Sequence, residues 1–308
     1  MEHSILKNRI AASVAAVICT LLWGTAFPFI KLGYAALSID GGDTGAKLLF
    51  AGLRFSLAGL MVLAFMSAKE RRIVLLKKDD VLPVVFIGLV LTFAQYLFTY
   101  IGIGFTTGTN TSIITACASF LTVLGAAIFF KGDRLTALKL TGCAVGFGGV
   151  LVMNRGGGVS ADTLPGDCLI FLSTVCAAGG NILSKKFVQG RDPVKLTGFQ
   201  LLFGGLLLCA AGLVLGGSID PRNVEGLLIL LWLAFVSAAA FSLWTALLKY
   251  HPASRISVFN LLVPVFGTLL SGILLGEDAF RPATFISLGL ISAGIVLVNL
   301  TKGGVKND

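Results

Sequence analysis

The charged side chains that enter apolar segments of this sequence are the first candidates for chemistry. Lys31 lies near the end of the first such segment, and Arg54 lies near the start of the second. A guanidinium can bind a carboxylate through two parallel hydrogen bonds, and an ammonium group can attract one as a point charge. In one interpretation, one or both attract an anionic group at the outer mouth of a membrane-embedded site. In the structural alternative, Lys31 extends to the aqueous interface and Arg54 pairs with helix carbonyls or with Asp40 or Asp43.

Uncharged polar and aromatic side chains lie near the middle of the same segments. Gln95 and Asn260 are the most unusual, because an amide in hydrocarbon is costly unless it finds hydrogen-bond partners. Such groups either line a pocket with mostly apolar walls or join helices to one another, and both readings stay open for each residue. The candidates for a substrate-binding pocket are Trp23, Thr25, Arg54, Gln95, Tyr96, Thr99, Thr115, Asn181, Ser242, Trp244 and Asn260.

Two prolines also lie inside apolar segments. Pro28 and Pro264 each remove a helix hydrogen bond and bend the helix that contains them. We expect them to act as hinges, and a static bend without functional motion is the equal alternative.

Several reaction classes lack the residues that they need. All fifteen acidic residues fall in loops, at helix boundaries or in tails, so we expect no mid-depth carboxylate that relays protons. The six cysteines form no CxxC pair and neither histidine is near one in sequence, so we expect no metal, disulfide or cofactor. The sequence has no GxxxxGK[ST] motif and no paired catalytic groups at mid-depth. We therefore expect neither direct use of ATP nor an enzyme.

The composition predicts an integral membrane protein. Of 308 residues, 56% are apolar and 13% are charged, and the mean hydropathy is +0.93. Soluble domains carry roughly 25% charged residues. The apolar runs between charge clusters are long enough to cross ~30 Å of hydrocarbon, and the first is too long to be the core of a secretory signal. We predict an all-α protein with ten transmembrane helices at about 10–31, 48–68, 81–104, 109–130, 137–154, 166–187, 196–216, 226–248, 256–276 and 282–301.

The distribution of basic residues predicts the orientation of these helices. The formal net charge is +9, which could suggest nucleic acid as a partner. If the N-terminus is cytoplasmic, however, eighteen of the 24 Lys and Arg residues fall in inside loops and tails, and four fall in outside connections. This positive-inside bias predicts that both termini are cytoplasmic. The expected partner is the lipid bilayer and not nucleic acid.

The two halves of the chain end alike. Residues 148–154 read GGVLVMN, and residues 293–299 read AGIVLVN, 145 positions later. Each half holds five predicted helices, and an odd number of crossings leaves the second half upside down relative to the first. We predict an N-terminal five-helix repeat at 1–155, a linker at 156–164, and a C-terminal repeat with a short cytoplasmic tail at 165–308.

Motifs in both halves resemble the EamA-type family of the drug/metabolite transporter superfamily. They are LWGTAFPFIK at 22–31, Arg54 in the second segment, LVPVF at 262–266 and LGE at 275–277. The resemblance covers nearly the whole chain. It implies a secondary transporter of small polar or amphipathic metabolites in the bacterial inner membrane, and specifically the export of amino acids or related compounds by alternating access.

The sequence departs from the family pattern in three places. These differences weaken any inference of the substrate from a characterised member of the family. Ser119 replaces an expected proline, Asp133 replaces a glutamate, and Ala177-Ala178 stand where tryptophan is common. Import or exchange of a sugar, a nucleotide-linked metabolite or a vitamin therefore stays open, as does a non-transporting membrane scaffold. The expected partner is a small-molecule metabolite, and the protein is expected to be monomeric or homodimeric.

Overall fold

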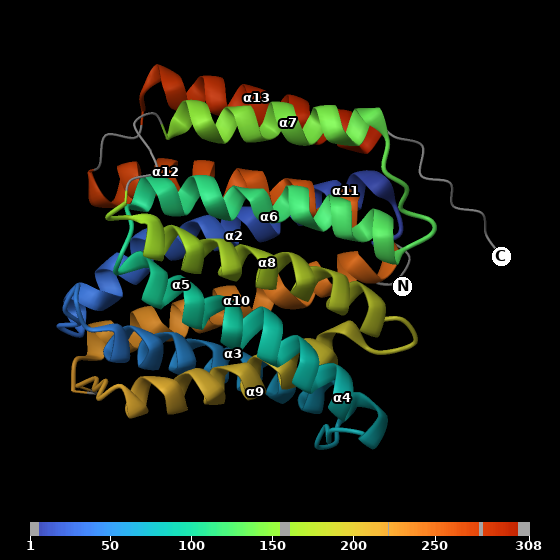
Figure 1. Cartoon of the computed structure of the whole chain (residues 1–308). Coiled ribbons are helices and arrows are strands. Elements are labelled where there is room, and N and C mark those ends of the chain that lie inside the picture. The colour runs from blue at the N-terminus through green and yellow to red at the C-terminus, as the bar shows by residue number, and fades with distance from the viewer. Residues whose placement is uncertain (1–5, 155–160, 221, 277–279, 301–308) are drawn as a thin grey trace.

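The computed structural model is built from helices throughout the part of the chain that it describes, which comprises residues 6–154, 161–220, 222–276 and 280–300. Most of the predicted linker, at 156–160, lies outside this part, as do Glu277 and Asp278 after the ninth span. Figure 1 shows the helices running side by side in one bundle. In chain order they are α2 (Arg9–Ala36), α3 (Thr44–Glu70), α4 (Lys78–Ile87), η1 (Gly88–Ala94), α5 (Gln95–Ile103), α6 (Gly108–Phe129), α7 (Ala137–Met153), α8 (Leu164–Phe187), α9 (Pro193–Val214), α10 (Val224–Tyr250), α11 (Ala253–Ser257), η2 (Val258–Leu261), α12 (Leu262–Leu275) and α13 (Pro282–Leu300).

These elements form the ten predicted spans, because α4, η1 and α5 are continuous and so are α11, η2 and α12. Nine spans in the described residues have at least 18 residues and enough hydropathy to cross a membrane. The tenth, α7, has 17 residues and is about 26 Å long, which is at the short limit for a transmembrane helix. The prediction of an all-α membrane protein is confirmed.

Local capping explains why some helices exceed their predicted bounds. The helix α3 begins at Thr44 and not at 48, because the Asp43 carboxylate accepts a hydrogen bond of 2.7 Å from the backbone N–H of Ala46. The helix α2 extends to Ala36 and not 31, so Lys31 lies inside its last two turns. These shifts change the depth of both charged candidates. Arg54 lies almost three turns into α3, deeper than the sequence indicated.

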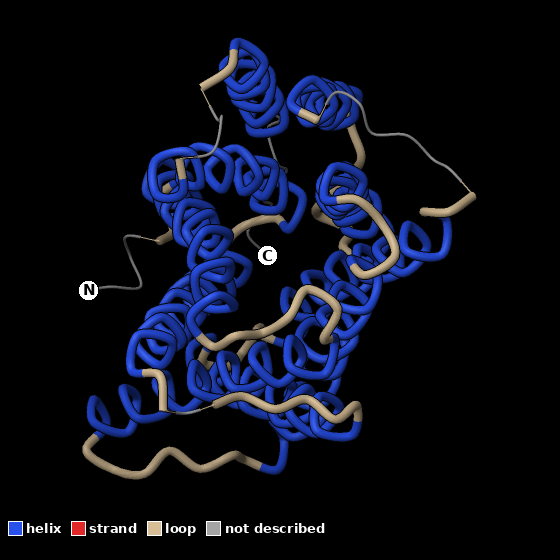
Figure 2. The backbone as a smooth tube through the Cα atoms, turned by 90° about the vertical axis from the view of Figure 1, so that its left-hand side faces the viewer, coloured by secondary structure: helices blue, strands red, loops and turns tan. Residues whose placement is uncertain are grey.

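The connections divide the bundle into two ends, which we call the termini end and the far end. Both described chain ends lie at the termini end, on the right in Figure 1, whereas the far end is on the left and faces the viewer in Figure 2. The connections at the termini end are 71–77, 130–136, 188–192 and 251–252. Those at the far end include 37–43 and 104–107, together with the described residues 215–220, 222–223, 276 and 280–281.

Two pairs of helices that correspond between the halves pack antiparallel in close contact. In α3 and α9, Gly52 meets Cys209 and Gly59 meets Leu202, so one residue number rises as the other falls. A Cβ on Gly52 would lie 2.4 Å from the Cys209 backbone nitrogen, a distance that only glycine permits. In the same way, Gly142 of α7 lies against Gly294 of α13. Small residues allow this approach in membrane bundles, and the antiparallel packing agrees with an inverted repeat.

Two spans contain irregular turns next to candidate polar residues. The third span is π-helical over Gly88–Ala94, immediately before Gln95. The ninth span is 3-10 helical over Val258–Leu261, and this segment contains Asn260. Irregular turns inside helices often mark functional positions, and in transporters they mark binding sites.

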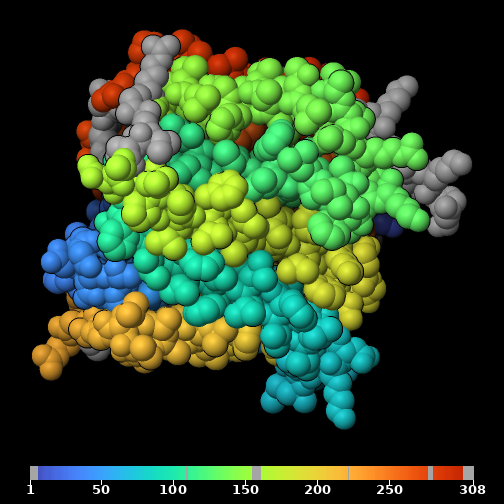
Figure 3. All heavy atoms as spheres, in the orientation of Figure 1, coloured from blue at the N-terminus to red at the C-terminus, as the bar shows by residue number. Residues whose placement is uncertain are grey.

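Apolar side chains fill the interior and also cover the outside. One buried cluster gathers around Trp244, Leu261 and Val265, and a second gathers around Phe55, Leu91 and Leu201. Trp23 packs against both. On the outside, Figure 3 shows the face formed by α4, α5, α6 and α8, where large apolar side chains such as Phe171 are half exposed, as a lipid-facing surface requires.

Candidate functional site

A chain of aromatic rings crosses the middle of the bundle. The ring centroids of Trp244 and Trp23 are 5.1 Å apart, and those of Trp23 and Phe241 are 5.2 Å apart. Phe241 lies 6.1 Å from Phe55, which lies 4.5 Å from Tyr96. These separations are typical of favourable edge-on and tilted aromatic pairs. The chain therefore connects three of the predicted site residues, Trp23, Tyr96 and Trp244, through helices α2, α3, α5 and α10.

Three buried polar atoms without partners belong to a residue of this aromatic chain or to its immediate sequence neighbours. The indole nitrogen of Trp23, the side-chain oxygen of Gln95 and the hydroxyl of Ser242 are all buried and have no hydrogen-bond partner among the described residues. Trp23 belongs to the chain itself, Gln95 directly precedes Tyr96, and Ser242 directly follows Phe241. Buried polar groups are almost always hydrogen-bonded, so each such group in a native fold needs an explanation. One such explanation is that the polar group faces a substrate or the water around it.

Three predicted threonines are already hydrogen-bonded within the protein. The Thr25 hydroxyl donates to the Leu22 carbonyl at 2.6 Å, and the Thr115 hydroxyl donates to the Thr111 carbonyl at 2.7 Å. The Thr99 hydroxyl shares a hydrogen bond of 2.6 Å with the Ser173 hydroxyl. The first two bonds lie within one helix, and the third joins α5 to α8.

Two further predicted residues, Trp244 and Asn181, are hydrogen-bonded to each other. The indole N–H of Trp244 donates to the side-chain oxygen of Asn181 at 2.9 Å, and both side chains are buried. This bond joins α10 to α8. Asn260 is only partly buried, in the 3-10 turn before α12, with Pro264 in the first turn of that helix. Pro28 lies in α2, which stays helical on both sides of it.

Arg54 is buried between α3 and α10. Its side chain is 3% exposed, its Nε donates to the Ser237 hydroxyl at 2.8 Å, and its guanidinium lies 5.1 Å from the centre of the Phe55 ring. Asp43 instead caps α3, and Asp40 accepts a hydrogen bond from the Gly41 backbone. Lys31, by contrast, is exposed. The two charged candidates are therefore not brought together.

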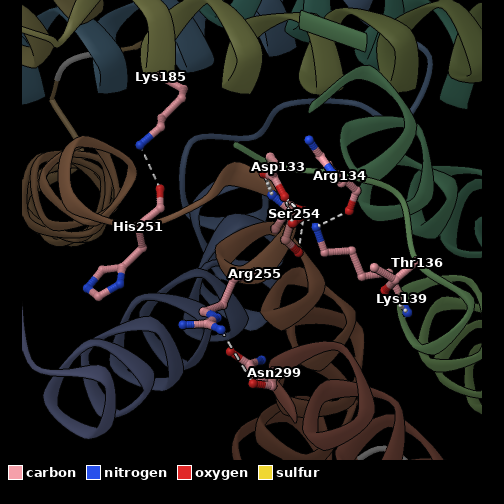
Figure 4. A network of polar contacts seen from close by, with 10 residues as sticks. Asp133, Arg134, Thr136, Lys139, Lys185, His251, Ser254, Arg255 and Asn299 are labelled. Atoms are coloured by element: carbon pink, nitrogen blue, oxygen red, sulfur yellow. Dashed lines mark hydrogen bonds and ion pairs between the residues drawn. The ribbon is translucent and has the colours of Figure 1, made fainter. Parts of the chain in front are cut away.

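At the termini end, a network of buried polar contacts joins the two halves of the chain, as Figure 4 shows. Asp133, in the turn after α6, forms an ion pair of 2.5 Å with Lys139, and both side chains are at least nine-tenths buried. The same carboxylate accepts hydrogen bonds from the backbone N–H of Ser254, at 3.0 Å, and from its hydroxyl. These bonds tie the loop of the first half to α11 of the second half.

A further hydrogen bond joins α6 to α11 at the same end of the bundle. The Ser119 hydroxyl of α6 donates to the Ser257 carbonyl of α11 at 2.8 Å, and both residues are fully buried. The helix α6 packs along α11 and η2, but α12 diverges from it toward the far end.

His251 lies at the termini end beside the network. Its Nε2 is 2.7 Å from the Leu6 carbonyl, and its own carbonyl accepts a hydrogen bond of 2.8 Å from Lys185. Burial lowers the pKa of His251 below its usual value, and the positive charges of Arg255, Lys185 and Arg9 lower it further, whereas the bond to Leu6 raises it. The imidazole is therefore held neutral.

Several residues of these arrangements did not stand out in the sequence. Phe55 and Phe241 read as ordinary core residues, and their place in the aromatic chain depends on tertiary packing. The link from Asp133 to Ser254 left no local signal, because the two residues lie far apart in the sequence. Among the described residues, no group of three His, Cys, Asp or Glu side chains could hold a metal ion.

The fold and this interior define a membrane transporter built from ten spans, with a polar and aromatic centre between antiparallel helix pairs. The chain belongs to the EamA-like transporter family, whose model matches residues 10–155 and again 164–300. It is therefore a transporter and not an enzyme, and it is an integral protein of the bacterial inner membrane.

Curated relatives agree with this family. The chain is 29% identical to a "Probable amino-acid metabolite efflux pump" of Escherichia coli (strain K12), over 92% of this chain and 93% of that protein. It is 26% identical to the "Uncharacterized transporter YetK" of Bacillus subtilis (strain 168), over 97% and 89%. It is 25% identical to the "Uncharacterized inner membrane transporter YedA" of Escherichia coli (strain K12), over 92% and 88%.

A solved structure shares the fold. A protein described only as "Crystal structure of protein" superposes with a TM-score of 0.78 at 21% identity, over 94% of this chain and 98% of the other. At that identity the likeness concerns the fold alone.

Proposed function

We propose that this protein is a secondary carrier that exports amino acids or related small polar or amphipathic metabolites without hydrolysing ATP. The relative named a probable amino-acid metabolite efflux pump supports this substrate class. The observation that carries the proposal is the set of unpartnered buried polar atoms of Trp23, Gln95 and Ser242 beside the aromatic chain. An amino acid offers both the polar groups and the apolar body that such a centre would bind.

The proposed binding site is the predicted set of residues around this centre. Trp23, Gln95, Tyr96 and Ser242 would contact the substrate directly, whereas Asn181 would orient the Trp244 ring through its hydrogen bond. Thr25, Thr99, Thr115 and Asn260 would complete the lining once a substrate competes for their hydroxyl or amide groups. Neither a metal nor a cofactor is needed for this recognition.

Alternating access follows from the closure at one end. The network of Asp133, Lys139 and Ser254 closes the termini end, while α6 and α12 separate toward the far end. The positive-inside bias places the termini end in the cytoplasm, so this conformation would be open to the outside. Export then requires this network to break and the helices that it joins to move apart. Pro28 and Pro264 are the proposed hinges.

Counterflow in proteoliposomes tests the proposal. Vesicles that contain the purified protein are loaded with unlabelled phenylalanine, and the uptake of labelled phenylalanine is measured against protein-free vesicles. We expect exchange that Gln95→Leu and Ser242→Ala reduce by at least tenfold. Exchange by the wild type that both variants leave unchanged would contradict the proposed binding site.

Import or exchange of another metabolite class is the competing function. The same counterflow experiment with a sugar, a nucleoside or a vitamin separates the classes, because a carrier exchanges only the molecules that it binds. Flux of a sugar without flux of any amino acid would overturn the proposed substrate class and leave the transporter family unaffected.

A further inference from the structure

The buried guanidinium of Arg54 lacks a compensating negative charge. In the described part of the chain, the carboxylates within ion-pair distance of a cation belong to Glu70, Asp80 and Asp133, and none of them faces Arg54. The Ser237 hydroxyl accepts one of the five guanidinium N–H groups. An arginine is almost never fully buried unless it is paired.

Phenol groups from two helices lie near the same guanidinium. Tyr34 of α2 and both Tyr96 and Tyr100 of α5 lie close enough to Arg54 to interact with it electrostatically. The Tyr34 hydroxyl is buried and lies next to that of Tyr100 without a well-formed hydrogen bond. The guanidinium and the phenol hydroxyls therefore lie together, and no printed ion pair of the described residues places a carboxylate beside them.

Resting on the export function proposed above, we propose that Arg54 binds the carboxylate of the transported molecule, with Tyr34 and Tyr100 donating hydrogen bonds to the same group. A carboxylate is planar and matches the two parallel N–H groups of a guanidinium. The single buried cation matches a monoanion.

The position of Arg54 suits this role. It precedes Phe55, whose ring contacts Tyr96 at 4.5 Å and Phe241 at 6.1 Å in the aromatic chain. A substrate with its carboxylate at Arg54 would lay its side chain along these rings. The site therefore selects amphipathic acids, above all amino acids with an apolar or aromatic side chain, over amines and amides of the same shape.

Asp133 provides a comparison for Arg54, because its buried charge has a structural role. There, Lys139, the Ser254 hydroxyl and a backbone N–H all balance one carboxylate. Removal of one partner from such a set destabilises a protein, whereas removal of a buried charge that has no partner relieves the fold. The two roles therefore predict opposite changes in thermal stability.

The test compares three molecules of one shape: phenylalanine, phenylalaninamide and phenethylamine. Each is offered to purified protein in a thermal-shift assay and to proteoliposomes in counterflow, with the wild type, Arg54→Gln, Tyr34→Phe and Arg222→Gln. Arg222 is an exposed arginine of the far end, so its variant is a matched loss of charge. Sodium acetate and sodium chloride are added alone in separate arms.

We expect the wild type to prefer phenylalanine over its amide by about ten- to a hundredfold, since hydrogen bonds to charged groups are worth more than neutral ones. Arg54→Gln should abolish that preference, Tyr34→Phe should reduce it, and Arg222→Gln should leave it unchanged. Without substrate, Arg54→Gln should melt no lower than the wild type.

Three results would overturn the proposal. They are an equal preference in wild type and Arg54→Gln, a much lower melting temperature of that variant without substrate, and protection by acetate or chloride alone equal to that by phenylalanine, which would assign the site to a resident inorganic anion. Failure of the export function is distinguishable, because the wild type would then show no counterflow while the binding assay still reports on Arg54.

Discussion

Asp133 accepts hydrogen bonds from both the backbone N–H and the hydroxyl of Ser254. The two residues belong to opposite halves of the chain. The carboxylate caps the first turn of α11 and pairs with Lys139 at 2.5 Å. One side chain thus joins the turn after α6 to the start of the ninth span. Any conformation that opens the termini end must break this contact.

Asp133→Asn should strongly destabilise the protein. The substitution leaves the buried Lys139 ammonium without its counter-charge, which typically costs about 3–5 kcal/mol in a folded protein. Thermal unfolding in detergent measures the loss. The control is Glu70→Gln at the partly exposed pair with Lys195, where the expected change is much smaller because water screens the two charges. Equal effects of the two substitutions would show that the Asp133 network does not hold this conformation.

His251 should make stability depend on pH in the weakly acidic range. Its pKa in the folded protein lies below that of the unfolded chain, which is near 6.5. As the pH falls through 6.5 toward the folded-state pKa, the unfolded chain binds a proton that the folded protein does not, so stability is lost. Above pH 6.5 the histidine contributes no pH dependence. In His251→Gln, the melting temperature should change less with pH over this window. An unchanged dependence of melting temperature on pH would show that His251 is not the group responsible.

Gln95 and Gln200 should respond differently to the same substitution. The oxygen of Gln95 has no partner, so Gln95→Leu should preserve stability while it lowers transport. The oxygen of Gln200 accepts a hydrogen bond of 2.7 Å from Thr92, and Gln200→Leu would leave that buried hydroxyl without its partner, at about 1–3 kcal/mol. Melting temperatures and counterflow rates of both variants check this. A greater loss of stability for Gln95→Leu would contradict the account.

Transport should depend little on an imposed pH gradient at fixed membrane potential. Proton-coupled carriers take up and release the proton at an ionisable group inside the membrane. The acidic residues of this sequence lie in loops, tails and the first or last turns of helices. Efflux from proteoliposomes with and without a gradient, clamped with valinomycin and potassium, gives the comparison. Acceleration of several fold by the gradient alone would refute this prediction.

The sequence predicted the helices well because each must present about 20 apolar residues to lipid. Their ends were less accurate, since the caps depend on single residues such as Asp43 before α3. Short apolar runs also do not reveal whether a helix continues past a lysine, as α2 does past Lys31.

The candidate site was only partly predictable. Mid-depth polarity singled out Gln95 and Ser242, whose unpartnered atoms agree with a pocket, but it could not separate them from Asn181 and Thr99, which the fold engages in hydrogen bonds. The sequence did not indicate Tyr34 and Tyr100 as site residues, because both lie toward the ends of their segments, where tyrosine is common at the membrane interface. Their convergence on Arg54 depends on how α2, α3 and α5 pack, which no local pattern encodes.

Locking the termini end tests alternating access most directly. Ser119→Cys and Ser257→Cys are introduced together after replacement of the six native cysteines, since the Ser119 hydroxyl contacts the Ser257 carbonyl at 2.8 Å. Oxidation in proteoliposomes should reduce phenylalanine counterflow to that of protein-free vesicles, reduction should restore it, and either cysteine alone should leave it unaffected. Full exchange by the cross-linked protein would contradict the account, because substrate would then cross while the termini end stays closed.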